Sequence, residues 1–212
     1  MAVRLADGVA VSALVLAGAV SVAVYDRLPA MVATHFDLAG QPNGWMPRPM
    51  AVSFTPALGA ALWVAVRFGP YLLPAAKRKN LTAASLALVA SMTSVFLAAL
   101  HILVVWVALT PGASITRPLV VMMSAFWLAL GLVMPRIRRN PIIGVRTPWT
   151  MASDENWARA QRVAGYAMVA GGLLAIGPAL AGGTVGAGVA IALLLGTSLI
   201  PAVYSLRWRK SE

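Results

Sequence analysis

Six long apolar stretches, separated by shorter polar connections, dominate the pattern of the chain. They run over Val9–Tyr25, Ala51–Leu73, Leu81–Leu109, Leu119–Met134, Val163–Ala181 and Ala187–Leu206. A bilayer core about 30 Å thick requires roughly 20 apolar residues per helix, so the pattern predicts an all-α integral membrane protein with a six-transmembrane-helix bundle. The fourth stretch is short. We expect it to recruit flanking residues, to lie in a thinned part of the bilayer, or to be shielded by its neighbours.

The basic residues are concentrated in alternate connections and at the two ends of the chain. If the N-terminus is cytoplasmic, 14 of the 17 Lys and Arg residues lie inside, and only Arg27, Arg48 and Arg117 lie outside. Cytoplasmic loops retain Lys and Arg during membrane insertion, so this asymmetry predicts an N-in, C-in topology. Arg4 and the small residues Ser21 and Ala23 could also mimic a cleaved secretory signal, but a retained first helix leaves an even number of spans.

Composition supports the membrane assignment and removes several other classes of function. The chain is 60% hydrophobic and 11% charged, and its mean hydropathy is +0.81. Its net charge of +11 follows from topology and from contact with anionic lipid, so we predict a membrane-lipid partner and no direct contact with nucleic acid. The chain contains no Cys, which excludes disulfides, thiolate catalysis and Cys-ligated metals.

Two connections are long enough to carry function, and they divide the chain. We predict an N-terminal two-span region over residues 1–75 with a structured outer loop at 26–50. A four-span region over residues 76–212 follows, with an inner loop at 135–162. The other connections are short, including a Gly-rich outside turn at Gly182–Gly186. In the fifth span, small residues recur every fourth position, a spacing that we expect to serve packing within one bundle.

The outer loop combines turn-forming residues with a possible pair of ligands. Its turn-forming and interfacial positions include Gly40, Asn43, Gly44 and Trp45, which predict a folded cap over the bundle, with Trp45 at the membrane interface. As an alternative, His35 and Asp37 could join His101 of the third span in a zinc site, because imidazole and carboxylate are zinc ligands. A hydrogen-bonded structural role for His101 competes with that alternative. We predict no metal site and no cofactor.

The inner loop contains the denser group of candidate binding residues. Pro141 and Pro148 disfavour helix at the residues before them, which are Asn140 and Thr147, so the intervening stretch should be extended or turned. Ser153 is a good N-cap, and a helix should run from there into the fifth span. Trp149 and Trp157 suit the inner membrane interface.

Arg146 is the inner-loop residue with the most specific chemistry. Its guanidinium could clamp the loop by pairing with Asp154 or Glu155, or it could face a cytoplasmic protein or a lipid headgroup. The polar side chains of Asn140 and Thr150 are further hydrogen-bond partners in the same loop.

These two loops together resemble the SdpI family of bacterial membrane proteins. The inner motif consists of Asn140, Pro141, Gly144, Arg146, Thr147, Pro148 and Thr150, followed by Ser153 and Trp157. The outer residues Pro29, His35, Phe36, Gly40, Pro42, Asn43, Gly44 and Trp45 resemble the uncharacterised N-terminal domain that commonly accompanies that family. The resemblance implies a multi-pass protein of the bacterial plasma membrane. The namesake of the family gives immunity to a secreted killing peptide and holds a cognate repressor at the membrane.

The leading hypothesis is therefore a non-enzymatic immunity or sensor protein, with a secreted peptide as its outer partner and a repressor as its cytoplasmic partner. A metal-dependent membrane enzyme using His35, Asp37 and His101 is a second hypothesis. A small transporter is a third, although the spans offer little ionisable chemistry beyond His101. The six acidic residues and the lack of a recognised catalytic motif argue against an enzyme.

Overall fold

Six helices that are long and apolar enough to cross a membrane make up most of the computed structural model, which describes residues 1–74 and 81–208. They are α1 (Ala2–Val24), α2 (Arg48–Phe68), α4 (Ala83–Leu109), α5 (Thr116–Val133), α7 (Asp154–Ala181) and α8 (Gly183–Ser205). The shorter elements are α6 (Pro148–Ala152), the strands β1 (Met31–Phe36) and β2 (Pro42–Pro47), and the 3-10 turns η1 (Tyr25–Arg27), η2 (Gly69–Leu72), η3 (Met134–Arg136) and η4 (Leu206–Trp208). The predicted six-helix membrane fold is confirmed.

The short fourth stretch recruits flanking residues, which is one of the three alternatives expected from the sequence. α5 begins at Thr116, and η3 extends the apolar segment so that the candidate span covers 21 residues, Thr116–Arg136. Pro135 lies in η3, where the helix has already tightened, so the missing N–H of proline interrupts no long α-helical ladder.

The expected Gly-rich turn at Gly182–Gly186 is wrong in its extent. Only Gly182, with φ +74°, lies between α7 and α8, and Gly183 already begins α8. The glycines that suggested a loop instead let the two helices approach closely. A Cβ at Gly186 would lie only 2.4 Å from the carbonyl oxygen of Pro178 in α7. Gly in a helix of a membrane protein is tolerated where it serves such close packing.

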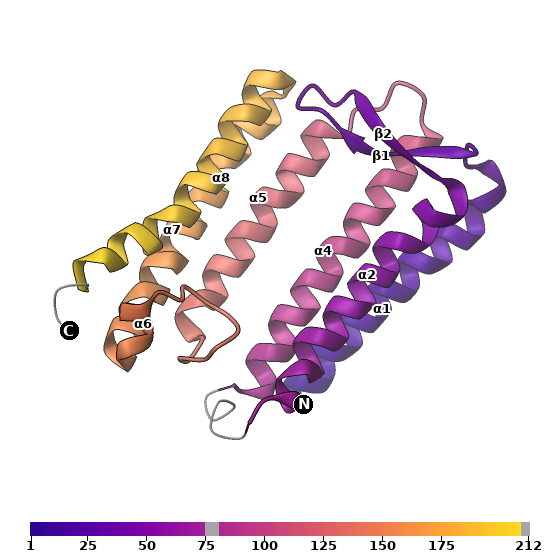
Figure 1. Cartoon of the computed structure of the whole chain (residues 1–212). Coiled ribbons are helices and arrows are strands. Elements are labelled where there is room, and N and C mark those ends of the chain that lie inside the picture. The colour runs from indigo at the N-terminus through magenta and orange to yellow at the C-terminus, as the bar shows by residue number, and fades with distance from the viewer. Residues whose placement is uncertain (75–80, 209–212) are drawn as a thin grey trace.

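The helices pack as two groups of three (Figure 1). In one group, α4 contacts both α1 and α2; in the other, α7 contacts both α5 and α8. The contact between α4 and α5 is smaller and includes Phe96 and Phe126, whose rings stack with centroids 4.6 Å apart. In packing, α4 therefore lies with the two helices of the N-terminal region. The predicted sequence boundary between residues 75 and 76 lies outside the described residues.

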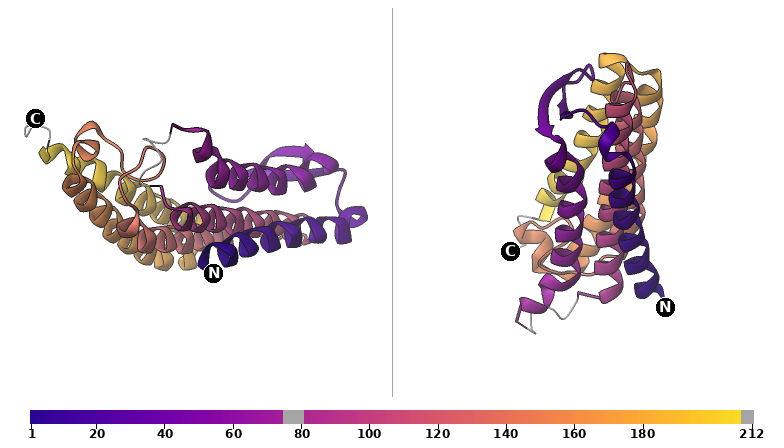
Figure 2. Two further views of the ribbon diagram at one scale, coloured as in Figure 1. Left: turned by 90° about the horizontal axis from the view of Figure 1, so that it is seen from below. Right: turned by 90° about the vertical axis from the view of Figure 1, so that its right-hand side faces the viewer.

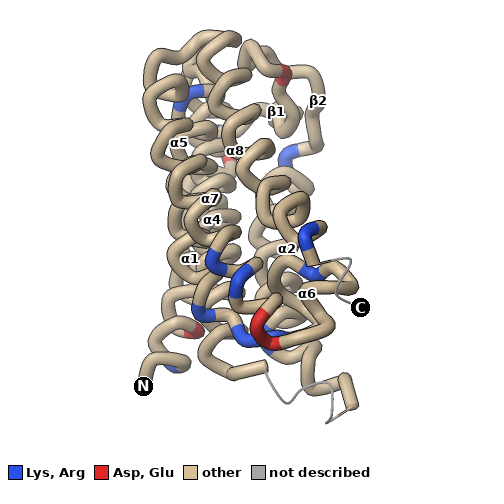
Figure 3. Tube along the Cα trace, turned by 90° about the vertical axis from the view of Figure 1, so that its left-hand side faces the viewer, with Lys and Arg blue, Asp and Glu red and all other residues tan. Residues whose placement is uncertain are grey.

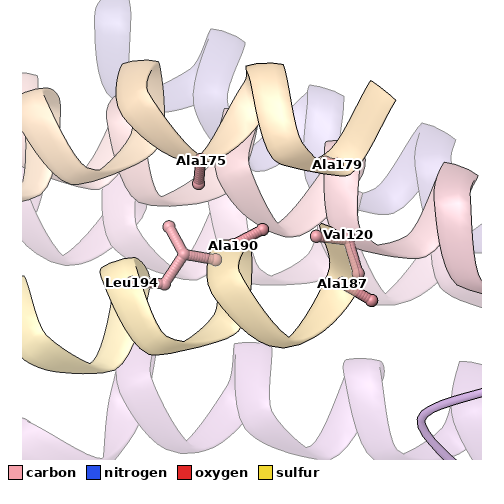
Figure 4. Close-up of a cluster of buried hydrophobic side chains, with 6 residues drawn as sticks. All are labelled: Val120, Ala175, Ala179, Ala187, Ala190 and Leu194. Atoms are coloured by element: carbon pink, nitrogen blue, oxygen red, sulfur yellow. The ribbon is translucent and has the colours of Figure 1, made fainter. Parts of the chain in front are cut away.

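Small residues form the centre of the second group, as the four-residue spacing predicted. Val120 of α5, Ala175 and Ala179 of α7, and Ala187, Ala190 and Leu194 of α8 make one buried cluster (Figure 4). Farther along α7, a Cβ at Gly171 would lie 2.2 Å from Thr197 Oγ1 of α8, and one at Gly172 would lie 2.7 Å from the Ser124 carbonyl oxygen of α5. Backbones this close gain dispersion contacts. Such contacts hold helices together in lipid, where burial of apolar surface gives little preference for helix–helix contact over helix–lipid contact.

The outer loop folds into a two-stranded antiparallel hairpin, β1–β2, and this strand structure was not predicted. Its base is anchored by a buried cluster in which Leu28 and Val32 pack on Ala51 of α2 and Val105 of α4. An isolated two-stranded hairpin is marginal in water, so this packing on the helices is what stabilises it. The folded cap that the turn residues predicted is therefore present, in the form of a hairpin.

The two ends of the bundle differ in structure and in charge. One end has the β1–β2 hairpin and is called the hairpin end. The other has the start of α1, the short helix α6 and the end of α8, and is called the motif end (Figure 2). Figure 3 shows that the Lys and Arg residues gather mainly towards the motif end. The segregation of charge predicted from the sequence is therefore a segregation between the two ends of the molecule.

Candidate functional site

The motif loop (residues 138–157) is ordered first by Asn140, which is buried with 4% exposure. Its amide nitrogen donates to the carbonyls of Arg138 (2.8 Å) and Ile143 (3.0 Å). Its side-chain oxygen accepts from the backbone N–H groups of Ile142 and Ile143, each at 2.8 Å. An Asn side chain can replace backbone partners in a turn, and here it does so with all of its bonds inside the loop. Asn140 therefore fixes the shape of the loop.

Gly144 allows the loop to lie directly on α7. Its φ of +122° is rarely adopted by other residues, and a Cβ there would lie 2.8 Å from Cη2 of Trp157 and 3.0 Å from Nε2 of Gln161. Trp157 is 2% exposed, and its Nε1 donates to the carbonyl of Ile137 over 2.7 Å. Trp157 therefore packs inside the protein and presents no exposed ring to lipid headgroups. Its N–H finds a backbone acceptor, so the whole ring can be buried.

Gln161 is a key contact that the sequence analysis missed. It is fully buried, accepts from the Val145 N–H (3.2 Å) and donates to the Val145 carbonyl (3.4 Å). The backbone N–H and carbonyl of Val145 are thus both bonded by the Gln161 side chain of α7, as buried backbone groups require. The sequence spacing could have indicated this contact, because Gln161 follows Trp157 by four residues and so lies on the same face of the helix.

The second half of the motif loop is tied to the end of α8. Thr147 caps α6 by accepting from the Thr150 N–H (3.2 Å), and Thr150 Oγ1 accepts from the Thr147 N–H (2.8 Å) and donates to the Val145 carbonyl (2.9 Å). Pro148 occupies the first helical position, where its fixed φ suits a helix start. Trp149 Nε1 donates to Ser205 Oγ of α8 over 2.6 Å. Ser205, fully buried, is a second contact that sequence reasoning missed.

Arg146 does not form the expected ion pair. Its guanidinium donates to the carbonyl of Pro141 inside the loop, and the two candidate acids pair elsewhere. Asp154 accepts from Arg139 Nε at 2.6 Å, and Glu155 pairs with Arg159 one helical turn away. The predicted N-cap is confirmed, because α7 begins directly after Ser153, whose Oγ accepts from the Asn156 N–H at 3.1 Å. Arg146 is exposed and keeps donors available for a ligand.

Arg146 belongs to a group of exposed cations at the motif end. Arg138, Arg146 and Arg162 are all exposed and have no carboxylate within ion-pair distance among the described residues. A loop held rigidly from beneath, with unpaired guanidinium groups on its surface, can bind an acidic protein segment or a phosphate group.

At the hairpin end, Asp37 and Gly40 build the turn between the strands. Asp37 Oδ1 accepts from the Gln41 N–H (2.8 Å), and the Gly40 N–H donates to the Asp37 carbonyl (2.9 Å). Gly40 has φ +82°, and a Cβ there would lie 2.3 Å from Oγ1 of Thr116 at the start of α5. Position 40 therefore requires glycine for two reasons: its backbone conformation and the close packing of the hairpin tip on α5.

The remaining hairpin residues are more exposed. Gly44 faces His35 across the ladder, where a Cβ would lie 3.0 Å from that of His35. Asn43 is exposed, and Trp45 is 54% exposed. Trp45, together with Met31 and Phe36, lines a cavity of about 520 Å³ between the hairpin and the α4–α5 connection. This volume is within the range of pockets that take small ligands or peptide side chains.

The alternative zinc site is not assembled. Among residues 1–74 and 81–208, no three His, Cys, Asp or Glu side chains converge in a way that could hold a metal ion. His101 is 1% exposed and lies 2.6 Å from Ser21 Oγ of α1, while His35 is exposed in β1 and Asp37 serves the turn. The competing expectation, a hydrogen-bonded structural His101, is confirmed.

An ion pair between α1 and α2 was also missed. Arg67 Nε lies 3.1 Å from both carboxylate oxygens of Asp7, and both side chains are largely buried. In the sequence, Arg67 counts only as one of the cations that set the topology. The signal was available, because Asp7 is an acid next to an apolar span, and such a group needs a partner.

Comparison with known proteins finds two family models that match parts of the chain, one over each loop. Residues 136–206 match the model of the SdpI/YfhL protein family, and residues 13–60 match a domain of unknown function, DUF1648. The first match contains the motif loop with α7 and α8, and the second contains the hairpin. No curated protein and no solved structure matches the chain.

Proposed function

The chain carries a region of the SdpI/YfhL protein family preceded by DUF1648, and on this basis we propose that it is a membrane immunity protein against a secreted antimicrobial peptide. The hairpin end faces the outside of a bacterial plasma membrane and meets the peptide. The motif end faces the cytoplasm and holds a repressor protein. The observation that carries the proposal is that both family matches coincide with a structured region, one at each end of the bundle.

The hairpin end supports a contact with a peptide. The 520 Å³ cavity beneath the hairpin combines polar and apolar lining groups with exposed aromatic surface from Trp45. Aromatic side chains supply large contact areas at low entropic cost in recognition of other proteins. The hairpin is also a two-stranded sheet whose outer edges can pair with an extended peptide.

The motif end supports a contact with a cytoplasmic protein. Asn140 fixes the shape of the motif loop, and the buried side chains of Trp157 and Gln161 hold the loop on α7. The guanidinium of Arg146 remains on the surface. Preorganisation of this kind lowers the entropic cost of binding. An acidic surface is the complement that exposed arginine residues would select.

One pair of helices connects the two ends. α7 begins under the motif loop, where Trp157 and Gln161 hold it, and ends at Gly182 next to the hairpin end. α8 returns from there to Ser205, which binds Trp149 of α6. A peptide that shifts the α7–α8 pair at the hairpin end would therefore act on both supports of the motif loop, which is a physical route for signalling.

Survival of a peptide-sensitive bacterium that expresses the chain tests this function. Secreted peptides from neighbouring strains are applied to cells that carry the chain, an empty vector, or a variant at the hairpin. We expect protection by the unchanged chain and a loss of protection with Trp45→Ala. Tyr166→Ala removes an aromatic side chain that is 71% exposed on α7 and lies outside the cavity, so it should keep full protection. Equal survival with chain and empty vector, at verified abundance, contradicts the proposal.

The metal-dependent enzyme receives no support from the arrangement of its three residues, so it is not proposed as a second function. His101 and Ser21 satisfy each other within the bundle, and His35 lies in a strand at its surface.

A further inference from the structure

A second cavity at the hairpin end has a different chemistry from the cavity under the hairpin. It has a volume of about 580 Å³, and its lining includes Ala39 at the hairpin tip, Trp106 of α4, Thr116 and Arg117 of α5, Gly182 between α7 and α8, and Gly183 at the start of α8. None of its lining residues is acidic, and Arg117 is the one charged residue among them.

Arg117 is held over the α7–α8 turn without a counter-charge. A Cβ at Gly182 would lie 2.7 Å from Nη2 and 3.1 Å from Nε of Arg117, so the guanidinium lies against the backbone of the turn. Arg117 forms no ion pair or hydrogen bond with any residue in the described ranges. Its planar fork of donors is therefore placed in the cavity and left available.

A buried hydroxyl and the start of a helix adjoin the same cavity. Thr116 Oγ1 is buried without a hydrogen bond among the described residues, and a buried hydroxyl without a partner is unfavourable. The 23-residue helix α8 begins at Gly183 with no side-chain cap, so its first N–H groups present the positive end of the helix dipole.

We propose that this cavity binds the phosphodiester of an anionic phospholipid headgroup. The cavity lies at the ends of the apolar spans, where headgroups lie, and Trp106 is 47% exposed beside it, as interfacial tryptophans are. One guanidinium matches the single negative charge of a phosphodiester, and the mainly apolar remainder of the lining suits the first carbons of an acyl chain. This inference does not depend on the proposed immunity function.

A local fluorescent reporter tests the site in the full-length protein in maltoside detergent. The chain has no cysteine, so Ala39→Cys gives a single labelling position at the rim of the cavity, remote from the cations of the motif end. The labelled protein is titrated with short-chain phosphatidylglycerol, with inorganic phosphate and with a short-chain diacylglycerol. We expect saturable binding of phosphatidylglycerol and much weaker responses to the other two probes.

Variants of the labelled protein identify the groups that bind. Arg117→Gln should weaken phosphatidylglycerol binding about tenfold or more, because hydrogen bonds to charged groups contribute that much free energy. Arg117→Lys keeps the charge but loses the fork, so its affinity for phosphatidylglycerol should lie between that of the unchanged protein and that of Arg117→Gln. Arg27→Gln is the matched control and should bind normally, because Arg27 is another exposed cation of the hairpin end whose side chain has no ion pair or hydrogen bond among the described residues.

The outcomes separate the proposal from its competitors. Equal affinity in the Arg117→Gln and Arg27→Gln variants overturns the site. Inorganic phosphate binding as tightly as the lipid overturns the lipid assignment in favour of a free anion, and an equal response to diacylglycerol shows that acyl chains alone produce the signal. If Arg117→Gln fails to fold, Thr116→Val replaces it, with an expected loss of roughly threefold for one neutral hydrogen bond.

Discussion

At the scale of single residues, His101 shows how a polar group is accommodated inside an apolar bundle. It is almost fully buried in α4, and its Nε2 lies 2.6 Å from Ser21 Oγ, which also donates to the Ala17 carbonyl of α1. Polar side chains that meet between membrane helices stabilise the pair of helices by a modest amount. His101 therefore links α4 to α1.

A double-mutant cycle between Ser21 and His101 measures that link. Ser21→Ala, His101→Leu and the double variant should show a coupling free energy of roughly 0.6 kcal/mol, and at most about 1.7 kcal/mol, in reversible unfolding from bicelles. His101→Gln should preserve most of the stability, because an amide still donates and accepts. Ser198→Ala is the control partner, since Ser198 donates only to Leu194 of its own helix and should add independently. No coupling at Ser21 removes the structural account of His101.

Arg146 and Arg138 test whether the motif end needs a guanidinium or only positive charge. Both are exposed, but only Arg146 is fixed by a bond to the Pro141 carbonyl. Arg146→Lys should reduce peptide protection several-fold because lysine cannot form the fork, and Arg138→Lys should be tolerated. Survival assays at matched protein abundance show whether the motif end needs the guanidinium or only the positive charge. Equal tolerance at both positions makes Arg146 a topogenic charge alone.

The motif residues also show where prediction from sequence stops. Asn140, Gly144 and the Ser153 cap could be anticipated, because turn chemistry and capping are local properties of the chain. The partners of Asp154 and Glu155 could not, because several arginines lie within reach in sequence and only the folded loop selects one for each. The burial of Trp157 depends in the same way on a distant carbonyl.

At the scale of helices and strands, close backbone contact organises the second group of helices. A Cβ at Gly165 of α7 would lie 2.7 Å from Cγ of Pro135 and 2.8 Å from the carbonyl oxygen of Gly131 in α5. No rearrangement of a flexible side chain can relieve the contact with backbone. These two helices therefore depend on glycine where they cross.

Substitution of one glycine by alanine separates packing from helix propensity. Gly165→Ala should destabilise the protein by about 1–3 kcal/mol, the usual cost of overpacking. Gly177→Ala in the same helix is the control, because nothing lies within 4 Å of its added Cβ, and it should be neutral or slightly stabilising. Unfolding of both variants in detergent gives the comparison. A loss of stability equal at the two sites attributes the effect to the helix backbone and contradicts the packing account.

The hairpin is the element that sequence reasoning recognised least. Gly40, Asn43 and Gly44 indicated turns, but β1 and β2 are short, and their pairing has irregular register around His35. The strands exist because Val32 and Leu28 find a buried place on α2 and α4. Apolar periodicity predicts long helices well, whereas short strands that depend on tertiary packing leave a weak signal.

At the scale of the whole molecule, the two ends of the helix bundle carry different structures. A hairpin over two cavities occupies one end, and a rigid loop with exposed arginines occupies the other, with α7 and α8 running between them. The segregated charges predict an N-in, C-in orientation, because topology is set by Lys and Arg near the ends of the spans. The grouping of α4 with α1 and α2 could not be predicted, since six apolar helices can pack in many orders.

The central claim is that the hairpin end faces outside and the motif end faces the cytoplasm, and accessibility of single cysteines tests it most directly. Asn43→Cys places a thiol on the exposed hairpin, and Leu206→Cys places one on an exposed residue after α8. A membrane-impermeant maleimide applied to intact bacterial protoplasts should label Asn43→Cys at once and Leu206→Cys only after permeabilisation. Labelling of Leu206→Cys in intact protoplasts, with Asn43→Cys protected, would contradict the account.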